Sequence, residues 1–390
     1  MGDKEPDGFI EQTKTKISEF FAHMIQYGIF NYKDGEITVF NNPYLFIPIS
    51  ALATIQYELN KVFPKEANTL IEWIGRVDGR TASNILVKRY GIDPKNIRRL
   101  LDAGTLTGLG KLDLKKVEEE EIIVTCINSP FAKYYKKKYG ISKEPVDYYI
   151  LGALVGSDIP ITGREAVGKE LFCIGKGDKY CEYQFLHGKY KRPSLIKKYL
   201  KKDPDKILNE ISSKFIRRMK FSSVSFKFKD IKFGDGNFIF NNILGISIPA
   251  FAIILLNELL LNYDPKFRDE FFIKVSESYI EDLDIPLINT SKFSSKQIQS
   301  IINNLSMFGF GSLKVRLIRN KKILFENFNN NYAKEYIEIF GYKKESSDIL
   351  LCKLIEIILR RSLNRSLSCI EKSCISNKNN NFCLFEVNIK

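Results

Sequence analysis

The stretch AKYYKKKYGISKEPVD, residues 132–147, returns 201 positions later as AKEYIEIFGYKKESSD, residues 333–348. The match belongs to a longer internal repeat, because residues 108–173 align with residues 309–374 without a gap. This period is far longer than the roughly 20–50 residues of a solenoid repeat. The sequence therefore predicts two copies of one domain of ordinary size.

The repeat divides the chain into three parts. We expect a first domain over residues 1–188, which opens with a helix at 9–28, a basic helical linker over 189–220, and a second, diverged domain over 221–390. In each copy the patterns predict helices first, then a strand pair, two helices and a closing hairpin. That order indicates an α+β fold with a small antiparallel sheet in each copy, rather than alternating βαβ units.

Two apolar runs need a separate interpretation. ILGISIPAFAIILL (243–256) and its counterpart YLFIPISALATIQYELN (44–60) are too short to span a bilayer, so we predict buried core helices and no transmembrane segment. The first residues, MGDKEPDGF, are acidic and polar and do not resemble a secretory signal. Together with seven cysteines, this favours a reducing compartment and a cytoplasmic location.

Each copy offers the same four types of metal ligand at matching intervals. The residues are Asp147, Glu170, Cys173 and Cys181 in the first copy, and Asp348, Glu371, Cys374 and Cys383 in the second. Two thiolates and two carboxylates can fill the tetrahedral shell of a structural zinc ion. The alternative is that the cysteines are small apolar residues beside a turn. The repetition of all four types favours zinc.

Other side chains bear on ligand binding and catalysis. Trp73 is the only tryptophan, and it is either a core aromatic or the wall of a ligand pocket with Arg76 or Tyr148 nearby. The chain has two histidines, His23 and His187, both in the first copy. No histidine-based catalytic set can therefore be duplicated, and we expect a protein that is not an enzyme.

The positive charge is concentrated between the two copies. Of the net charge of +14, residues 189–220 contribute +9, from twelve basic and three acidic residues. Asp203-Pro204 separates two helical stretches, and Lys197, Lys198, Lys201 and Lys202 lie on the first stretch or just after it. The segment is either a solvated helical linker docked on one copy or a surface for an anionic partner such as nucleic acid, a membrane or an acidic protein.

The motifs of the first copy also carry a family resemblance. CIGKGDKYCEYQF (173–185), VDYYILGALVG (146–156) and INSPFAKYY (127–135) resemble the 4-vinyl reductase domain family. The resemblance covers about 34–187 and, in degenerate form, 235–390. It implies a mixed helix and sheet fold shared with subunits of TRAPP vesicle-tethering complexes, domains that dimerise and a pocket for small hydrophobic molecules.

The resemblance also implies a zinc site near the closing hairpin. In phenol-sensing regulators similar to this family, the ligands are a helix cysteine followed by Glu, Cys and Cys. The matching positions here are Asp147, Glu170, Cys173 and Cys181, so an aspartate replaces the helix cysteine. The two copies are then expected to pair within one chain as a pseudo-dimer, and two chains could pair as a homodimer.

Three hypotheses for the function follow. The first is a sensory or regulatory protein that binds a small hydrophobic ligand, contains structural zinc and is not an enzyme. The second is a nucleic-acid-associated transcriptional regulator that acts through the basic linker. The third, suggested by the family name, is an enzyme that reduces a vinyl group on a tetrapyrrole.

Overall fold

The fold is described from a computed structural model. The description covers residues 30–390 except 34, 40–41, 92–94, 192, 201–202, 219–230, 235, 284, 289–292, 320, 343–347 and 376–381. The predicted helix at 9–28 lies outside the described residues.

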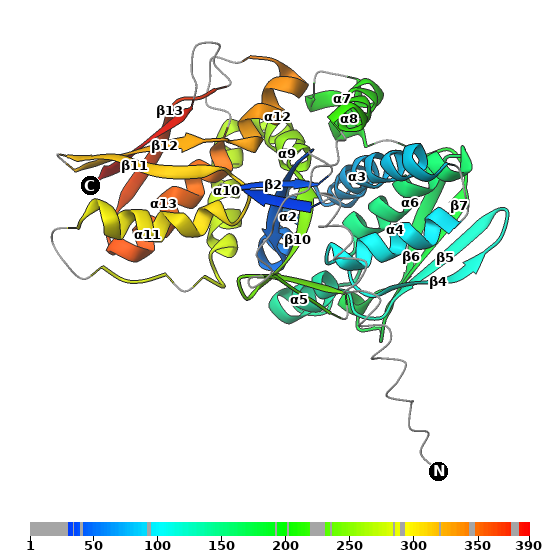
Figure 1. The fold of residues 1–390 in the computed structure, drawn as a ribbon. Helices are drawn as coiled ribbons and strands as arrows, with labels where there is room; N and C mark the ends of the chain where they lie inside the picture. The colour runs from blue at the N-terminus through cyan, green and yellow to red at the C-terminus, as the bar shows by residue number, and fades with distance from the viewer. Residues whose placement is uncertain are drawn as a thin grey trace.

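A six-stranded antiparallel sheet forms the middle of the molecule and takes three strands from each copy (Figure 1). Its strands, in spatial order, are β1 (Phe30–Lys33), β2 (Glu36–Val39), β3 (Asn42–Pro48), β10 (Ile243–Pro249), β9 (Asn237–Phe240) and β8 (Ile231–Gly234). In the central pair, Phe46 lies opposite Ser247. These two positions are equivalent in the repeat, so a pseudo-twofold axis passes between them and the two copies pair as predicted.

Each copy also builds its own four-stranded antiparallel sheet. In the first copy the spatial order is β4 (Leu112–Val117), β5 (Glu121–Cys126), β7 (Cys181–His187) and β6 (Ala166–Phe172). In the second it is β11 (Ser312–Arg319), β12 (Lys322–Phe328), β14 (Cys383–Ile389) and β13 (Leu367–Ser373). The strand pair and the closing hairpin combine identically in both copies, which confirms the α+β fold class.

Among the described residues, five helices of each copy pack around these sheets. Those of the first copy are α2 (Ile49–Val62), α3 (Ala67–Tyr90), α4 (Lys95–Leu106), α5 (Pro130–Tyr139) and α6 (Tyr148–Thr162). Their equivalents are α9 (Ala250–Tyr263), α10 (Pro265–Tyr279), α11 (Ser295–Ser306), α12 (Asn331–Phe340) and α13 (Ile349–Leu363). Within the described part of the chain, no helix is long and apolar enough to cross a membrane.

The apolar runs 44–60 and 243–256, interpreted as buried core helices, begin with strands that the sequence patterns did not predict. In both, the chain runs as a strand up to Pro48 or Pro249, and the helix begins only at the next residue. Proline has no backbone N–H and is tolerated at the edge of a helix but not inside it. The sequence pattern does not predict these strands because most of their residues are buried. A continuous apolar run therefore replaces the usual alternation of apolar and polar residues.

Reciprocal backbone hydrogen bonds join the copies on either side of the central strands. The N–H of Gly110 donates to the carbonyl of Gly236 over 3.1 Å, and the N–H of Gly311 donates to that of Gly35 over 2.9 Å. These are equivalent pairs in the repeat. Gly35 and Gly236 have positive φ, and an added Cβ at either would overlap the backbone of the opposite copy. The short GLG and GFG motifs are therefore docking points for the hairpin of the other copy.

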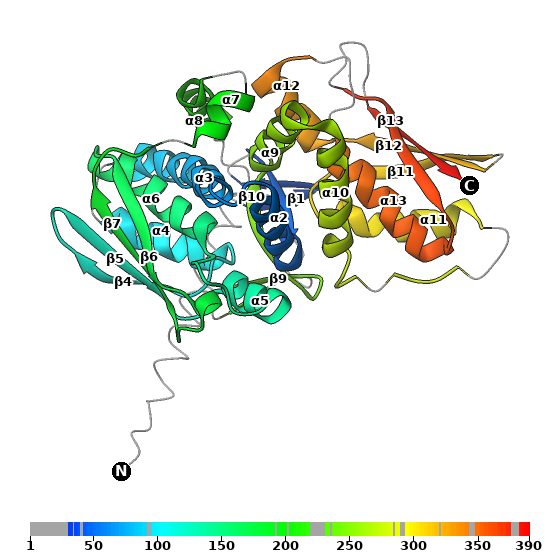
Figure 2. The ribbon, with the colours of Figure 1, turned by 180° about the vertical axis from the view of Figure 1, so that it is seen from behind.

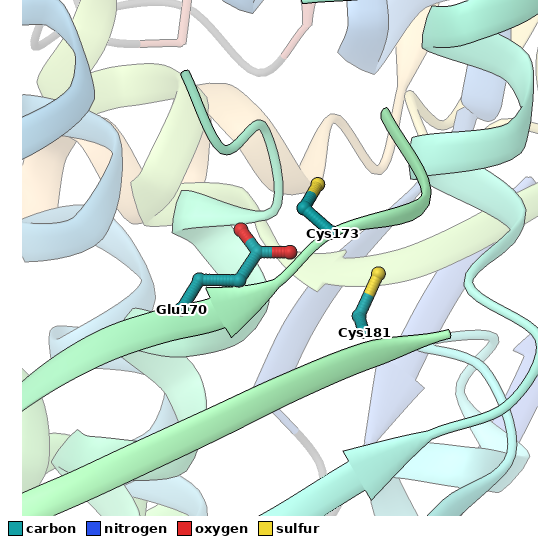
Figure 3. A group of neighbouring side chains, drawn as sticks. All are labelled: Glu170, Cys173 and Cys181. Carbon is teal, nitrogen blue, oxygen red and sulfur yellow. The ribbon is translucent and has the colours of Figure 1, made fainter. Parts of the chain in front are cut away.

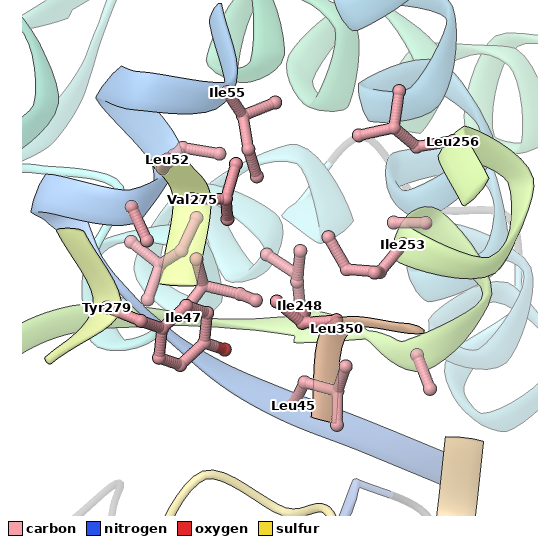
Figure 4. Close-up of a cluster of buried hydrophobic side chains, with 14 of the residues drawn as sticks. Leu45, Ile47, Leu52, Ile55, Ile248, Ile253, Leu256, Val275, Tyr279 and Leu350 are labelled. Atoms are coloured by element: carbon pink, nitrogen blue, oxygen red, sulfur yellow. The ribbon is translucent and has the colours of Figure 1, made fainter. Parts of the chain in front are cut away.

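One continuous apolar core extends across the pseudo-twofold axis (Figure 4). Leu45 and Ile47 from β3 lie beside Ile248 from β10, and helix α2 packs against α10 of the other copy (Figure 2). Such shared burial removes apolar surface from water in both copies at once, at roughly 25 cal/mol per Å². The two copies therefore share a core in addition to their separate sheets.

The linker folds as two short helices that contact both copies. They are α7 (Ser194–Tyr199) and α8 (Pro204–Arg218), separated at Asp203-Pro204 as the sequence predicts. Helix α7 packs on α9, and α8 packs on α3 and α12. Arg218 of α8 forms an ion pair with the buried Glu335 over 2.6 Å. The linker thus bridges the copies, which corrects the alternative of a linker docked on one copy and leaves the alternative of an anionic partner open.

The first copy contains an unusually close helix pair, α3 with α6. Gly75 and Gly79 on α3 face Gly152 and Gly156 on α6, and an added Cβ at any of the four would overlap backbone of the partner helix. In the second copy neither α10 nor α13 contains a glycine. Their side chains prevent α10 and α13 from approaching as closely, so the copies differ in how their longest helices pack.

Replacement of Gly236 by alanine tests the inter-copy contact. The positive φ alone costs about 1–2 kcal/mol, and overlap with the Gly110 backbone adds about 1–3 kcal/mol. We expect the substitution to lower the free energy of unfolding, measured by urea denaturation, by the sum of these two costs. Gly163→Ala is the control, because Gly163 also has positive φ but open space around its Cβ position. Equal losses in the two variants would contradict a tight contact at Gly236.

A second prediction concerns Asp78 on α3, whose carboxylate accepts a hydrogen bond from the Tyr149 hydroxyl over 2.7 Å. Burial raises the pKa of Asp78 from 3.8 to about 7. The folded protein then holds this proton more tightly than the unfolded chain, so the free energy of unfolding falls as the pH rises from about 4 to about 7. Asp78→Asn keeps the acceptor and should flatten that slope in denaturant melts across this pH range, whereas replacement of the exposed Asp113 by asparagine should not.

Candidate functional site

Three of the four first-copy metal ligands predicted from the sequence meet at one end of the β6–β7 hairpin (Figure 3). Glu170 lies on β6, Cys173 just after it and Cys181 at the start of β7, and their ligand atoms all lie within 4.8 Å of one another. The turn between them is held by Asp178, whose carboxylate accepts the N–H of Cys173 over 2.8 Å. All three ligand residues are buried, so this group could hold a metal ion.

Asp147, the residue before α6, lies next to this group but outside the 4.8 Å set. Its N–H donates to Glu170 Oε2 over 3.2 Å, and its Oδ2 accepts from the Tyr183 hydroxyl over 2.9 Å. Asp147 Oδ1 and Glu170 Oε1 are buried and have no hydrogen-bond partner among the described residues. Buried carboxylate oxygens without a partner are costly, and a cation would relieve both.

The ionisable groups of this site are buried close together, and each shifts the pKa of its neighbours. Burial, followed by the nearby Cys173, raises the pKa of Asp147 to about 7. Burial and the Asp147 carboxylate raise the pKa of Glu170 well above its usual value. The hydrogen bond from Cys181 lowers the pKa of the Cys173 thiol to about 6, and the same bond raises the pKa of Cys181. A thiolate is thus favoured at Cys173, and thiolates are the form that binds metal.

The second copy brings together Glu371, Cys374 and Cys383 in the same way, again within 4.8 Å. Both carboxylate oxygens of its aspartate, however, accept hydrogen bonds from other residues of the protein. Asp348 Oδ1 accepts the N–H of Leu351 as the N-cap of α13 over 3.2 Å, and its Oδ2 accepts from the Asn330 side chain over 2.8 Å. In the first copy Asp147 makes no such cap, and Ser129 stands at the position of Asn330.

The three residues predicted for a ligand pocket lie apart from the cavity described below. Trp73 is buried on α3, and Tyr148 is half-buried at the start of α6. Arg76 is engaged in structural contacts: it forms an ion pair with Glu72 over 2.8 Å, donates to the carbonyl of Ala166 over 2.9 Å and stacks on the Tyr190 ring. Their role in ligand binding stays a prediction.

A small cavity lies elsewhere in the first copy, between α4, α6 and the sheet strands β5 and β7. It is lined by Ile97, Leu100, Leu101, Ile122, Val124, Leu154, Ser157, Asp158, Ile161 and Phe185. Eight of these are apolar, and the free space is narrow, about 20 Å³. Ser157 already donates to backbone carbonyls of α3 and α6. Asp158 is therefore the remaining polar group of the wall.

Sequence reasoning missed this cavity because its walls come from four distant segments. One signal was present: Asp158 interrupts an otherwise apolar stretch of α6 and is 4% exposed. Of the linker lysines, Lys197 and Lys198 are exposed on α7, whereas Lys201 and Lys202 lie outside the described residues.

No family model and no curated protein matches the chain. Solved structures similar to it include the phenol-responsive sensory domain of the transcription activator PoxR with phenol, at 15% identity and a TM-score of 0.39, covering 54% of this chain and 98% of that domain. A TRAPP subunit 3 from Naegleria fowleri, covalently bound to palmitic acid, is similar at 14% identity and a TM-score of 0.26, covering 37% and 97%. Membership of the 4-vinyl reductase family stays a prediction.

Proposed function

We propose that this chain is a sensory protein, not an enzyme, that binds a small apolar ligand in its first copy and is stabilised there by zinc. The observation that carries the proposal is the placement of both features on helix α6. Asp147 immediately precedes the helix at the metal group, and Asp158 in its last two turns lines the cavity. Helix α6 thus joins the proposed metal site at its N-terminal end to the cavity near its C-terminal end.

The donor set of the first copy suits zinc. Cys173, Cys181 and Glu170 would supply three ligands, and Asp147, with its unpartnered oxygen, the fourth. Four protein ligands leave no position for a reactive water, so the ion would be structural. Zinc would supply positive charge to a group of buried acids and couple its binding to folding.

The surroundings of the cavity suggest how a ligand would be sensed. Helix α4 forms one wall, and the segment after it carries Gly108 and Gly110, which contact the second copy. A ligand that separates α4 from α6 would therefore act directly on the inter-copy contact. Ligands shift a protein toward the arrangement that they bind best, and here the two arrangements would differ in how the copies meet.

The size of the cavity argues against the tetrapyrrole reductase hypothesis. Its free space of about 20 Å³ is close to that of a single water molecule. A small ligand could enter with a modest shift of α4, whereas a macrocycle would require α4 to leave the sheet. We therefore infer that the cavity serves recognition of a small molecule rather than chemistry on a tetrapyrrole.

The zinc assignment predicts one tightly held ion per chain. Because Asp348 is occupied as a helix cap, the second copy offers one ligand fewer and should lose its ion to a mild chelator. Cys173→Ser should therefore remove the tight ion and lower the melting temperature, while the matched Cys374→Ser should leave it in place. Elemental analysis after dialysis against chelator measures both. A fully folded wild type without zinc would contradict the assignment.

Ligand binding is tested by filling the cavity. Ile161→Phe adds volume to its wall and should abolish the rise in melting temperature caused by benzyl alcohol, because the ligand stabilises only the folded protein that binds it. Zinc content unchanged from the wild type serves as the control for folding. Stabilisation by benzyl alcohol that is equal in both proteins would place the binding elsewhere.

A second candidate function rests on the exposed basic side of the linker. Leu195 and Ile196 are buried against the body of the protein, while Lys197 and Lys198 point to solvent. Such an arrangement suits an anionic partner, nucleic acid in the first place.

Changing Lys197, Lys198, Lys201 and Lys202 to glutamine tests this candidate. Nucleic-acid binding should weaken and its salt dependence should flatten, because fewer counterions are released. The free energy of unfolding should change little, because exposed charges such as those of Lys197 and Lys198 contribute little to stability. Retention on nucleic acid and on anionic lipid that is unchanged by the substitution would leave the segment as a solvated helix.

A further inference from the structure

Resting on the function proposed above, we propose that the cavity of the first copy selects small apolar amines, and that Asp158 is the residue that recognises the ammonium group. The proposal names the ligand class and the specificity-determining residue.

The position of Asp158 carries the inference. Its side chain lines the cavity and the residue is 4% exposed, yet Oδ1 has no hydrogen-bond partner among the described residues. Oδ2 faces His187 Nε2 at 3.4 Å and the Thr162 hydroxyl at 3.5 Å. A carboxylate oxygen only accepts hydrogen bonds, and leaving it unpaired in an apolar surrounding is costly. A hydrogen-bond donor on a ligand would give Asp158 Oδ1 the partner that it lacks.

The local charge favours a cationic donor over a neutral one. Asp158 lies near the C-terminus of α6, where the helix carbonyls give a partial negative charge that attracts cations. The other lining residues are apolar apart from Ser157, so the wall itself provides no cation. Burial raises the pKa of Asp158 and the neighbouring His187 counteracts this effect. A hydrogen bond between charged groups in such a site is roughly twice as strong as a neutral one.

The second copy shows that the fold does not need an acid here. The positions equivalent to Asp158 and His187 are Leu359 and Ile389, both buried. Apolar side chains fill this place well when no ligand has to be recognised, and they avoid the cost of burying a carboxylate. The acid and the histidine of the first copy are therefore additions to the scaffold, as expected for a recognition site.

Three probes that differ only in their polar group test the selection. Benzylamine, benzyl alcohol and benzoate are titrated into the zinc-loaded, full-length protein at pH 7 by calorimetry. We expect benzylamine to bind at least tenfold more tightly than benzyl alcohol, and benzoate not to bind. Asp158→Asn should reduce the affinity for benzylamine at least tenfold and leave that for benzyl alcohol unchanged.

Two further variants control for misfolding of the Asp158 variant and for a general effect of surface charge. Asp158→Leu introduces the residue that the second copy already accommodates, so it should fold if the asparagine variant does not, and it should lose the preference for the amine. Glu119→Gln removes a nearby acid whose side chain is 81% exposed and should leave all three affinities unchanged.

Each outcome separates this inference from the function on which it rests. If benzyl alcohol binds as tightly as benzylamine, or if Asp158→Asn keeps the preference, the amine selection is wrong and the ligand-binding function stands. If Glu119→Gln also removes the preference, general surface charge rather than Asp158 is responsible, and the selection is again wrong. If no probe binds, the proposed ligand-binding function itself fails.

Discussion

The antiparallel pairing of β3 with β10 is the constraint on which the rest of this structure depends. Phe46 and Ser247, which are equivalent in the repeat, face each other across it, so the backbone pairing is the same on both sides of the pseudo-twofold axis. The sheet is completed only when both copies contribute, and the Gly35 and Gly236 turns then dock on backbone of the opposite copy. A shift of either copy by one residue along this sheet would break the hydrogen bonds from Gly110 to Gly236 and from Gly311 to Gly35.

This shared sheet defines what the second copy contributes to the pair. Its contribution of β8, β9 and β10 is needed to close the central sheet, whatever else it does. Its aspartate has become a helix cap, and its counterpart of Asp158 is a buried leucine. The second copy therefore keeps the features that hold the pair together, while the polar groups that suit a metal or a ligand are more complete in the first.

Much of the fold could be predicted from the sequence, because the signals were local. Ser129-Pro130 and Gly140 set the ends of α5, and Asp203-Pro204 separates the linker helices as expected. The central strands could not be recognised in this way. Buried in the middle of a sheet, β3 and β10 lost the alternation that identifies a strand, and their pairing joins segments about 200 residues apart. Local patterns carry no information about such a pairing.

The candidate site was predictable in composition but not in function. Spacing alone placed Glu, Cys and Cys together correctly in both copies, since a hairpin brings its two ends into contact. Spacing could not distinguish Asp147 from Asp348, because the difference lies in Asn330, a neighbour with no metal-binding role of its own. The cavity was even harder to predict from the sequence, since its walls meet only after α4 and α6 have packed on the sheet.

Helix α6 gives the two features of the first copy a common mechanical basis. Its glycines hold it against α3, so it cannot move away from the core without losing that close contact. Its N-terminal end adjoins the buried acids and thiols, and the far end presents Asp158 to the cavity. In the function proposed above, α4 would be the element that yields to a ligand, because α6 is packed closely along α3. Because α4 leads directly to Gly108 and Gly110, the proposal requires that a change in its position reach the contact between the copies.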